Sequence, residues 1–366
     1  MNDIDKLFFE LIRVAIGNAV CLSHTPTNAE WMQLYELAKK QSLVGICFAG
    51  VQRLQGQKQS PPEMLYLQWM GMAAKIQQRN EVLNRQCAEL QAKLSDCGMR
   101  SSILKGQGIA SLYHSLHSDL SLLRQPGDID VYVDCGREKA IEYARSMQNE
   151  VNWDYKHLHL NIFKDTEVEM HYRPEILLDL CKNRKLQRWF ERKEVQEQIF
   201  CKQGYLVAPS VEFNAFFILL HIYRHFLYEG VGLRQLMDWY FVLKSRNNDN
   251  VDDDDNLLSL IEQFGMKRFA KGVMWIMKSV FGLEDEYLIC PCDEKEGRYI
   301  LDVVMDGGNF GHHKAKVMLD GKGKYYTVLR VVRHNIHLIT HYPKDALWPP
   351  VYFVWHKLWK LKHRNI

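Results

Sequence analysis

Two aspartates, Asp128 and Asp130, occupy alternate positions in the stretch Gly-Asp-Ile-Asp-Val-Tyr-Val at residues 127–133. In a β-strand, residues i and i+2 project from the same face, so the two carboxylates should point together while the apolar residues between them point into the core. Two like charges so close repel each other. A Mg²⁺ or Mn²⁺ ion, which prefers hard oxygen ligands, offsets that repulsion. The spacing therefore predicts that both aspartates are catalytic metal ligands.

A third carboxylate, Glu169, is expected beside this pair. Two alternating segments, 157–163 and 167–172, are separated by Lys-Asp-Thr at 164–166, which is typical of a hairpin. If the second segment lies next to the Asp128 strand, the Glu169 carboxylate joins the two aspartates. The predicted metal and catalytic set is then Asp128, Asp130 and Glu169, which is enough to hold two ions.

A short strand at 101–105 is expected to break at Gly106. The junction of a strand and a helix presents free backbone N–H groups to a phosphate, and glycine lets the phosphate approach the backbone. Lys105 would add positive charge. Arg124, four residues before Asp128, could reach the same phosphates, although it could equally be a surface charge. These three residues are predicted to bind a nucleotide.

Two residue pairs with i, i+4 spacing occur on helices farther along the chain. His221 and His225 share one helix face, and Arg234 and Asp238 share the next, where they could pair with each other. One interpretation is that these polar groups lock the helices beneath the catalytic unit. The other is that they line the pocket for the nucleotide or its acceptor.

Hydrophobic periodicity indicates the elements that must position these residues. Apolar residues at helical spacing predict three helices in the first hundred residues, the last a long one beginning at the prolines 61 and 62. Residues 100–173 are predicted as strand, helix (109–116), strand (129–133), helix (137–147) and two strands. The remaining predicted helices are 211–228, 232–245, 256–264, 267–281, 295–305, 323–338 and 347–363.

The expected fold is therefore α+β: a small mixed-sheet core flanked by N-terminal and C-terminal helical regions. We expect the boundaries of these three parts at 1–99, 100–208 and 209–366. The sequence has 366 residues with 47 basic and 44 acidic side chains, a formal charge of +3. This near-neutral balance does not indicate a nucleic-acid partner. Nine dispersed cysteines, the absence of a signal peptide and the absence of a transmembrane segment favour the cytoplasm.

Taken together, these residues resemble the DNA polymerase β-type nucleotidyltransferase superfamily, and in particular a bacterial family of uncharacterised nucleotidyltransferases. The resemblance covers about residues 40–245. It is carried by Leu104-Lys105-Gly106, Arg124-Gln-Pro-Gly127-Asp128-Ile-Asp130, Glu169-Met-His171-Tyr-Arg, Pro209-Ser-x-Glu212, Leu219-Leu-His221-x-x-x-His225 and Arg234-x-x-x-Asp238.

The resemblance implies transfer of a nucleoside monophosphate from an NTP such as ATP to an acceptor, with release of pyrophosphate. Asp128 and Asp130 would hold the Mg²⁺ or Mn²⁺ ions that bridge the triphosphate, and Glu169 would complete the second metal site and help to activate the acceptor hydroxyl. His171 would join the nucleotide-binding residues. The acceptor, whether small molecule, carbohydrate or protein, is left open.

Two other hypotheses compete with this enzyme. The chain could be a regulatory protein that binds a nucleotide without efficient turnover. It could also be a metallohydrolase using His157, His159, Asp128 and Asp130, in which case it would prefer zinc or another borderline metal to Mg²⁺.

Overall fold

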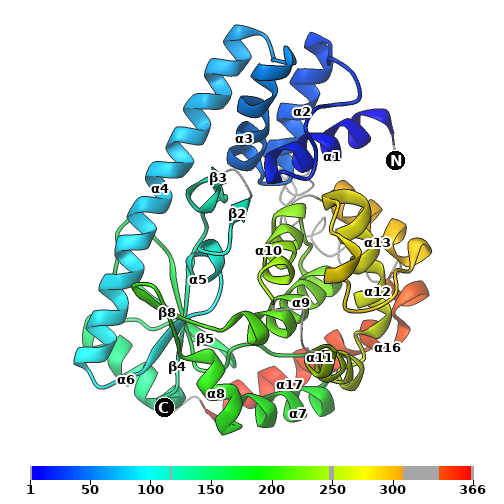
Figure 1. The fold of residues 1–366 in the computed structure, drawn as a ribbon. Helices are drawn as coiled ribbons and strands as arrows, with labels where there is room; N and C mark the ends of the chain where they lie inside the picture. Colours follow the sequence, from blue (N-terminus) through cyan, green and yellow to red (C-terminus); the bar gives the residue numbers. More distant parts are fainter. Residues whose placement is uncertain (1, 116–117, 247–250, 308–337, 364–366) are drawn as a thin grey trace, which may run out of the picture.

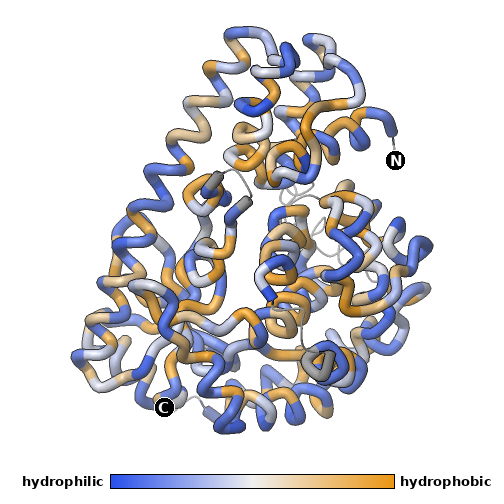
Figure 2. The backbone as a smooth tube through the Cα atoms, viewed as in Figure 1, coloured by the Kyte–Doolittle hydropathy of each residue, from blue (hydrophilic) through white to orange (hydrophobic). Residues whose placement is uncertain are grey.

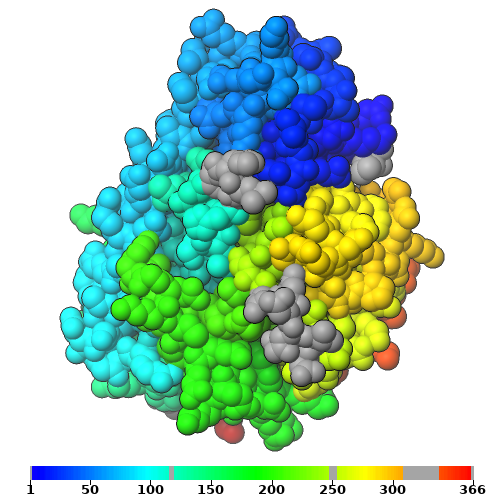
Figure 3. All heavy atoms as spheres, viewed as in Figure 1, coloured from blue at the N-terminus to red at the C-terminus, as the bar shows by residue number. Residues whose placement is uncertain are grey.

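The computed structural model describes residues 2–115, 118–246, 251–307 and 338–363. Figure 1 shows a small sheet flanked by helices from both parts of the chain, with the N-terminal helices (blue) at one end of the molecule. In the space-filling view of Figure 3, the α/β unit (cyan) and the later helices (green to yellow) lie side by side beneath that end. The predicted α+β class with a small mixed sheet is confirmed.

Four helices precede the sheet: α1 (Asp3–Ile16), α2 (Asn28–Lys40), α3 (Val44–Leu54) and α4 (Glu63–Asp96), with a short turn η1 (Gln55–Gln57). Capping boxes at Asn2 and Thr27 satisfy the free backbone N–H groups at the starts of α1 and α2. The sequence predicted three helices here and missed α3. Because α3 is buried on nearly all sides, its sequence lacks the polar face that marks an amphipathic helix.

The main sheet has four strands in the order β1-β4-β6-β5. Their bounds are β1 (Ser101–Ile103), β4 (Ile129–Val133), β5 (His157–Leu160) and β6 (Val168–His171). Strands β4 and β6 are parallel, whereas β1 pairs with β4 and β5 pairs with β6 in antiparallel fashion. The predicted hairpin is therefore confirmed as β5 and β6, and its second strand lies beside the strand that follows Asp128.

The two faces of this sheet have different roles. The apolar face belongs to a separate core, in which the second half of α4 and the helix α6 (Gly136–Met147) cover the strands. Val131, Met170 and Leu158 occupy successive strands on this face and are fully buried. The other face carries Asp130, Glu169 and the histidines of β5 and β6, so the alternation in sequence separates core from site.

The predicted helix at 109–116 is wrong. A single turn, α5 (Gln107–Ala110), is followed by a small hairpin of β2 (His114–Ser115) and β3 (Ser118–Asp119) and a turn η2 (Ser121–Leu123). The chain turns at Tyr113, whose ring packs on Phe241 with ring centroids 4.2 Å apart and whose hydroxyl donates to Asp238. These tertiary contacts outweigh the local helical pattern.

Helices dominate the rest of the chain. They are α7 (Leu180–Phe190), α8 (Lys193–Ile199), α9 (Val211–Tyr228), α10 (Leu233–Lys244), α11 (Val251–Gln263), α12 (Lys267–Ile276), η3 (Met277–Phe281), η4 (Asp285–Tyr287), α13 (Glu294–Gly307), α16 (Pro343–Ala346) and α17 (Trp348–Lys362), with a hairpin of β7 (Cys201–Gln203) and β8 (Leu206–Ala208).

Most of the predicted C-terminal helices agree with these bounds to within two residues, but α11 begins five residues earlier than expected, and 267–281 divides into α12 and a π-helical turn. Helices α7 and α8 were not predicted, because their sequences are strongly polar and bury few residues. The predicted helix at 323–338 lies almost wholly outside the described residues.

Helices α9 and α10 are buried along most of their lengths and run through the middle of the molecule. Figure 2 shows hydrophobic segments gathering there, while polar segments lie toward the outside. Within the described residues, every helix is too short or too polar to cross a membrane. All nine cysteines are free, as their dispersed positions predicted.

Gly108 lies where α5 approaches β1 too closely for any side chain. A Cβ atom there would lie 2.0 Å from the carbonyl oxygen of Ile103. We expect Gly108→Ala to lower the free energy of unfolding by about 1–3 kcal/mol, because the backbone must shift to relieve the clash. Chemical denaturation measures the change.

The matched control is Gly71→Ala, on the exposed side of α4, where an added Cβ meets no atom within 4 Å. This substitution should raise stability by about 0.5–1 kcal/mol, since alanine favours a helix over glycine. Equal effects at the two positions would contradict the close packing of α5.

Candidate active site

Asp130 and Glu169 lie opposite each other on the parallel strands β4 and β6. Side chains in register on neighbouring strands share a sheet face, so both carboxylates project to the polar side, as the sequence predicted. Asp130 is only 4% exposed. Asp128 is one residue before β4 and is exposed. All three acids line the same cavity.

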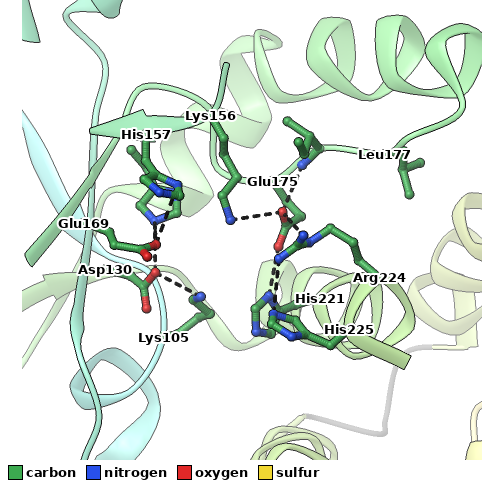
Figure 4. Close-up of polar contacts among 12 residues, drawn as sticks. Lys105, Asp130, Lys156, His157, Glu169, Glu175, Leu177, His221, Arg224 and His225 are labelled. Atoms are coloured by element: carbon green, nitrogen blue, oxygen red, sulfur yellow. Dashed lines mark hydrogen bonds and ion pairs between the residues drawn. The ribbon is translucent and has the colours of Figure 1, made fainter. Parts of the chain in front are cut away.

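Two basic groups contact Asp130 and Glu169. The Lys105 ammonium lies 2.9 Å from one oxygen of Asp130, and the His171 Nε2 lies 2.9 Å from the same oxygen. His171 Nε2 is also 3.3 Å from Glu169. Lys105 was predicted to bind phosphate, but it lies within the carboxylate group and points into the cavity (Figure 4).

The charges at this site shift the proton affinities of the three acids in different directions. Burial alone would raise the pKa of Asp130, but Lys105 and His171 hold it well below its usual range. Burial opposes ionisation of Glu169 as well, yet contact with His171 lowers its pKa to about 2. The charge of Asp130 raises the pKa of Asp128. Asp130 and Glu169 are therefore firmly ionised at neutral pH, and Asp128 holds a proton more readily.

The carboxylates and histidines of the sheet form two groups of potential metal ligands. Among the described residues, ligand atoms of Asp130, Glu169 and His171 lie within 4.8 Å of one another, as do those of His157, His159 and Glu169. Asp128 is in neither group. The alternative ligand set of two histidines with both aspartates is therefore corrected: the histidines gather around Glu169, because β5 pairs with β6 and not with β4.

A second charged group, which includes residues of α9, faces the sheet, and Glu175 from the segment between β6 and α7 lies at its centre. Glu175 is 1% exposed and accepts from His221 Nδ1 at 2.9 Å. The guanidinium of Arg224 lies 3.1 Å from Glu175, and the Lys156 ammonium lies 3.4 Å from it. Burial would raise the pKa of Glu175, but these cations hold it well below its usual range.

Arg224 extends this group along α9. It contacts Glu229 at 2.6 Å, and His225 Nδ1 lies 3.0 Å from the other oxygen of Glu229. Burial lowers the pKa of both His221 and His225, which makes their rings neutral at physiological pH. Figure 4 shows the sheet group and the α9 group facing each other, with Lys105 and Lys156 between them.

Arg124 and Asp238 form the third wall. Arg124 is 4% exposed and contacts Asp238 with two parallel hydrogen bonds of 2.7 and 2.8 Å. Asp238, which could pair with Arg234 by its i, i+4 spacing on α10, has the planar fork of Arg124 on both carboxylate oxygens. Arg234 donates to the carbonyl of Gln125 at 3.2 Å. The surface role considered for Arg124 is excluded by its burial.

These walls enclose a cavity of about 300 Å³. It brings together most of the predicted site residues, namely Lys105, Gly106, Arg124, Asp128, Asp130, Glu169, His221, His225, Arg234 and Asp238. His171 is 0% exposed and lies beneath the carboxylates, so it is not among the lining residues. Gly106 adopts φ +57°, a backbone conformation that glycine allows without strain.

Sequence reasoning missed several polar residues that shape the cavity. Lys156, Asp154 and Glu229 line it, and Glu175 supports one of its walls. Lys156 immediately precedes the alternating histidines of β5, which is a signal that could have identified it. Glu175 follows a proline in an irregular segment, and its contact with His221 joins residues 46 positions apart. No local pattern marks such a residue.

His171 provides a prediction on pH. Burial would lower its pKa, but hydrogen bonds to Asp130 and Glu169 raise it. A histidine with a raised pKa stabilises the fold fully below about pH 6.5 and loses this effect as pH rises through the raised value. In metal-free buffer, the loss of stability in His171→Gln should therefore be larger near pH 6 than near pH 9.

The control is His157→Gln. Burial and the neighbouring charge of His171 lower the pKa of His157 to about 4. A lowered pKa makes the folded state lose stability at acid pH, so this variant should gain relative to wild type as pH falls. Thermal unfolding across the pH range compares the two. If the difference in stability from wild type changes with pH in the same way for both variants, the charges assigned to His171 and His157 are contradicted.

No curated protein matches the chain. A family described as uncharacterised nucleotidyltransferases matches residues 27–282, which include the whole sheet, the cavity walls and helices α9 to α12. This match covers more than half of the 366 residues. The chain therefore belongs to the family of uncharacterised nucleotidyltransferases.

Proposed function

We propose that this protein transfers a nucleoside monophosphate from an NTP to an acceptor hydroxyl and releases pyrophosphate. The observation that carries this proposal is the cavity itself. Ionised carboxylates on the sheet face the Arg224 guanidinium of α9 and the Lys156 ammonium, which lies just before β5, across a space of about 300 Å³. A metal–triphosphate complex needs both, because the metal requires acidic oxygens and the phosphates require positive charge.

The carboxylates fit Mg²⁺ or Mn²⁺. Asp128, Asp130 and Glu169 offer the hard oxygen ligands that these ions prefer, and all three line the cavity. The raised pKa of Asp128 reflects repulsion from Asp130, which a bound cation would offset. Asp128, Asp130 and Glu169 would hold the ions. When bound, two such ions would neutralise the charge that develops on the triphosphate during transfer.

The cationic side chains would bind and orient the phosphates. Lys156 and Arg224 are both held by Glu175, which directs them while leaving other N–H donors for an anion. Lys105 lies between the two walls and would contact the phosphate nearest Asp130. Such preorganised donors stabilise charge without rearranging during the reaction.

The acceptor hydroxyl must lose its proton. Glu169, with a pKa of about 2, is a weak base, so it would orient the hydroxyl more than abstract its proton. Asp128 has the higher proton affinity of the three acids and is the most exposed. A bound cation would offset the repulsion that raises its pKa, so Asp128 would serve as a metal ligand and the proton would pass to solvent.

Turnover separates this proposal from a protein that only binds nucleotides. The protein is incubated with each labelled NTP, Mg²⁺ or Mn²⁺ and a cell extract that supplies acceptors. Release of labelled pyrophosphate that requires both protein and extract supports transfer. Nucleotide binding without any release would favour the regulatory function instead. Activity that needs zinc and yields no pyrophosphate would favour the metallohydrolase built on His157, His159 and Glu169.

A further inference from the structure

Helix α17 packs on the α/β unit through an aromatic face. Trp355 lies edge-on to Tyr155 with ring centroids 4.9 Å apart, and Trp359 lies edge-on to Trp153 at 5.8 Å. The Arg137 guanidinium is 5.0 Å from the ring of Trp359. Figure 1 shows α17 (red) along the base of the molecule. One side of this helix thus packs against the α/β unit.

A neighbouring side of α17 and the residue just before it form a second apolar face, which is exposed. Its members recur at intervals of four and three residues, which places them in one stripe along the helix. They are Leu347 (67% exposed), Val351 (48%), Val354 (58%), Leu358 (62%) and Leu361 (62%). Single exposed apolar residues are common, but a continuous stripe of five marks an interaction surface. We name these five residues the outer stripe.

Lysines flank the outer stripe on both sides. At 100° per residue, Lys357 lies along one border and Lys362 along the other. The Lys357 ammonium is 4.3 Å from the ring centroid of Phe353, so its hydrocarbon stem follows the apolar surface. No acidic residue occurs between 346 and 363. The surface is therefore apolar at its centre and positive at its edges.

This charge pattern favours one kind of binding partner for the outer stripe over another. Two copies meeting stripe to stripe would bring their lysine borders together, which is unfavourable. An anionic bilayer receives the aliphatic side chains below its headgroups and the lysines among them. We infer that the outer stripe of α17 lies on an anionic lipid surface. The same helix packs on Tyr155, next to the cavity residues Asp154 and Lys156, so binding would hold the cavity beside the bilayer.

Vesicle sedimentation with the full-length protein tests this inference. Vesicles of phosphatidylcholine alone are compared with vesicles that also contain phosphatidylglycerol. We expect the protein to sediment with the anionic vesicles only. Val354→Ser/Leu358→Ser should weaken this binding by about tenfold or more, because it removes aliphatic burial. Lys357→Glu/Lys362→Glu should weaken it on the order of thirtyfold.

The matched control is Met64→Ser/Leu67→Ser on α4, where Met64 is 79% exposed and Leu67 is 46% exposed. It removes two exposed apolar side chains away from α17 and should leave vesicle binding unchanged. Thermal unfolding of all variants confirms that they fold, since each changed residue is on the surface. Absence of binding to anionic vesicles, or equal loss in the control, overturns the inference. The inference is also overturned if the wild-type protein is a dimer that Val354→Ser/Leu358→Ser dissociates, because a second copy would then cover the outer stripe.

Discussion

Asp128→Asn should lose about a hundredfold to a thousandfold of the pyrophosphate-releasing activity while becoming slightly more stable. The loss follows because an amide cannot replace a carboxylate that holds a cation. The gain follows because the charge of Asp130 raises the pKa of Asp128, which means that the folded protein disfavours the ionised side chain. Activity and thermal unfolding are measured on the same preparation in metal-free and Mg²⁺-containing buffer.

The sign of the stability change depends on pH. A carboxyl group with a raised folded pKa destabilises the protein increasingly as pH rises above its unfolded value of about 3.9. The advantage of Asp128→Asn should therefore be present at neutral pH and shrink in acid. Asp96→Asn, at the exposed C-terminal end of α4, is the control and should change neither property appreciably. Full activity in Asp128→Asn would remove this residue from the proposed machinery.

Glu175→Gln should be among the most destabilising single substitutions at the site. Glu175 is 1% exposed and contacts Lys156, His221 and Arg224. Its removal takes the nearest counter-charge from Lys156 and leaves Arg224 with Glu229 alone, and breaking a buried ion pair in this way costs about 3–5 kcal/mol. Chemical denaturation measures the loss. Affinity for NTP should fall as well, because Lys156 and Arg224 are no longer held toward the cavity.

Glu167→Gln is the matched control for this prediction. Glu167 also contacts a histidine, His159 at 3.1 Å, but its side chain is 65% exposed. Exposed ion pairs contribute about 0–1 kcal/mol, so this variant should remain close to wild type. If both substitutions lower the free energy of unfolding by similarly small amounts, Glu175 does not hold Lys156 and Arg224 in place.

The sheet side of the site could be predicted from sequence because its signals are local. Asp130 and Glu169 belong to short strands whose polar and apolar residues alternate, and this alternation assigns each side chain to a face. The hairpin between β5 and β6 is marked by its turn residues. Because this sheet has four strands, β6 has few possible neighbours besides β5, and β4 is one of them.

The helical side could be predicted only in part. Spacing placed His221 and His225 on one face of α9, but the residue that holds His221 is Glu175, from a distant segment. Local spacing also placed Arg234 and Asp238 on one face of α10, but the bidentate partner of Asp238 is Arg124, from another part of the chain. Partner choice among buried charges is decided by tertiary geometry, which one sequence does not display.

The same reason explains the errors in the fold. Helix α3 is buried on nearly every side and has no amphipathic period to detect. The segment after α5 has a helical pattern, but the contacts of Tyr113 with Phe241 and Asp238 turn it into a hairpin. In each case a long-range contact decides the conformation, and the local sequence is compatible with more than one.

The central claim is that this cavity holds a metal–triphosphate complex. Crystals grown with Mn²⁺ and a non-hydrolysable NTP test it most directly, because the anomalous signal of manganese locates each ion. The expected result is manganese beside Asp128, Asp130 and Glu169, with the triphosphate directed toward Lys156 and Arg224. Manganese held by His157 and His159, or a nucleotide bound outside the cavity, would contradict the account.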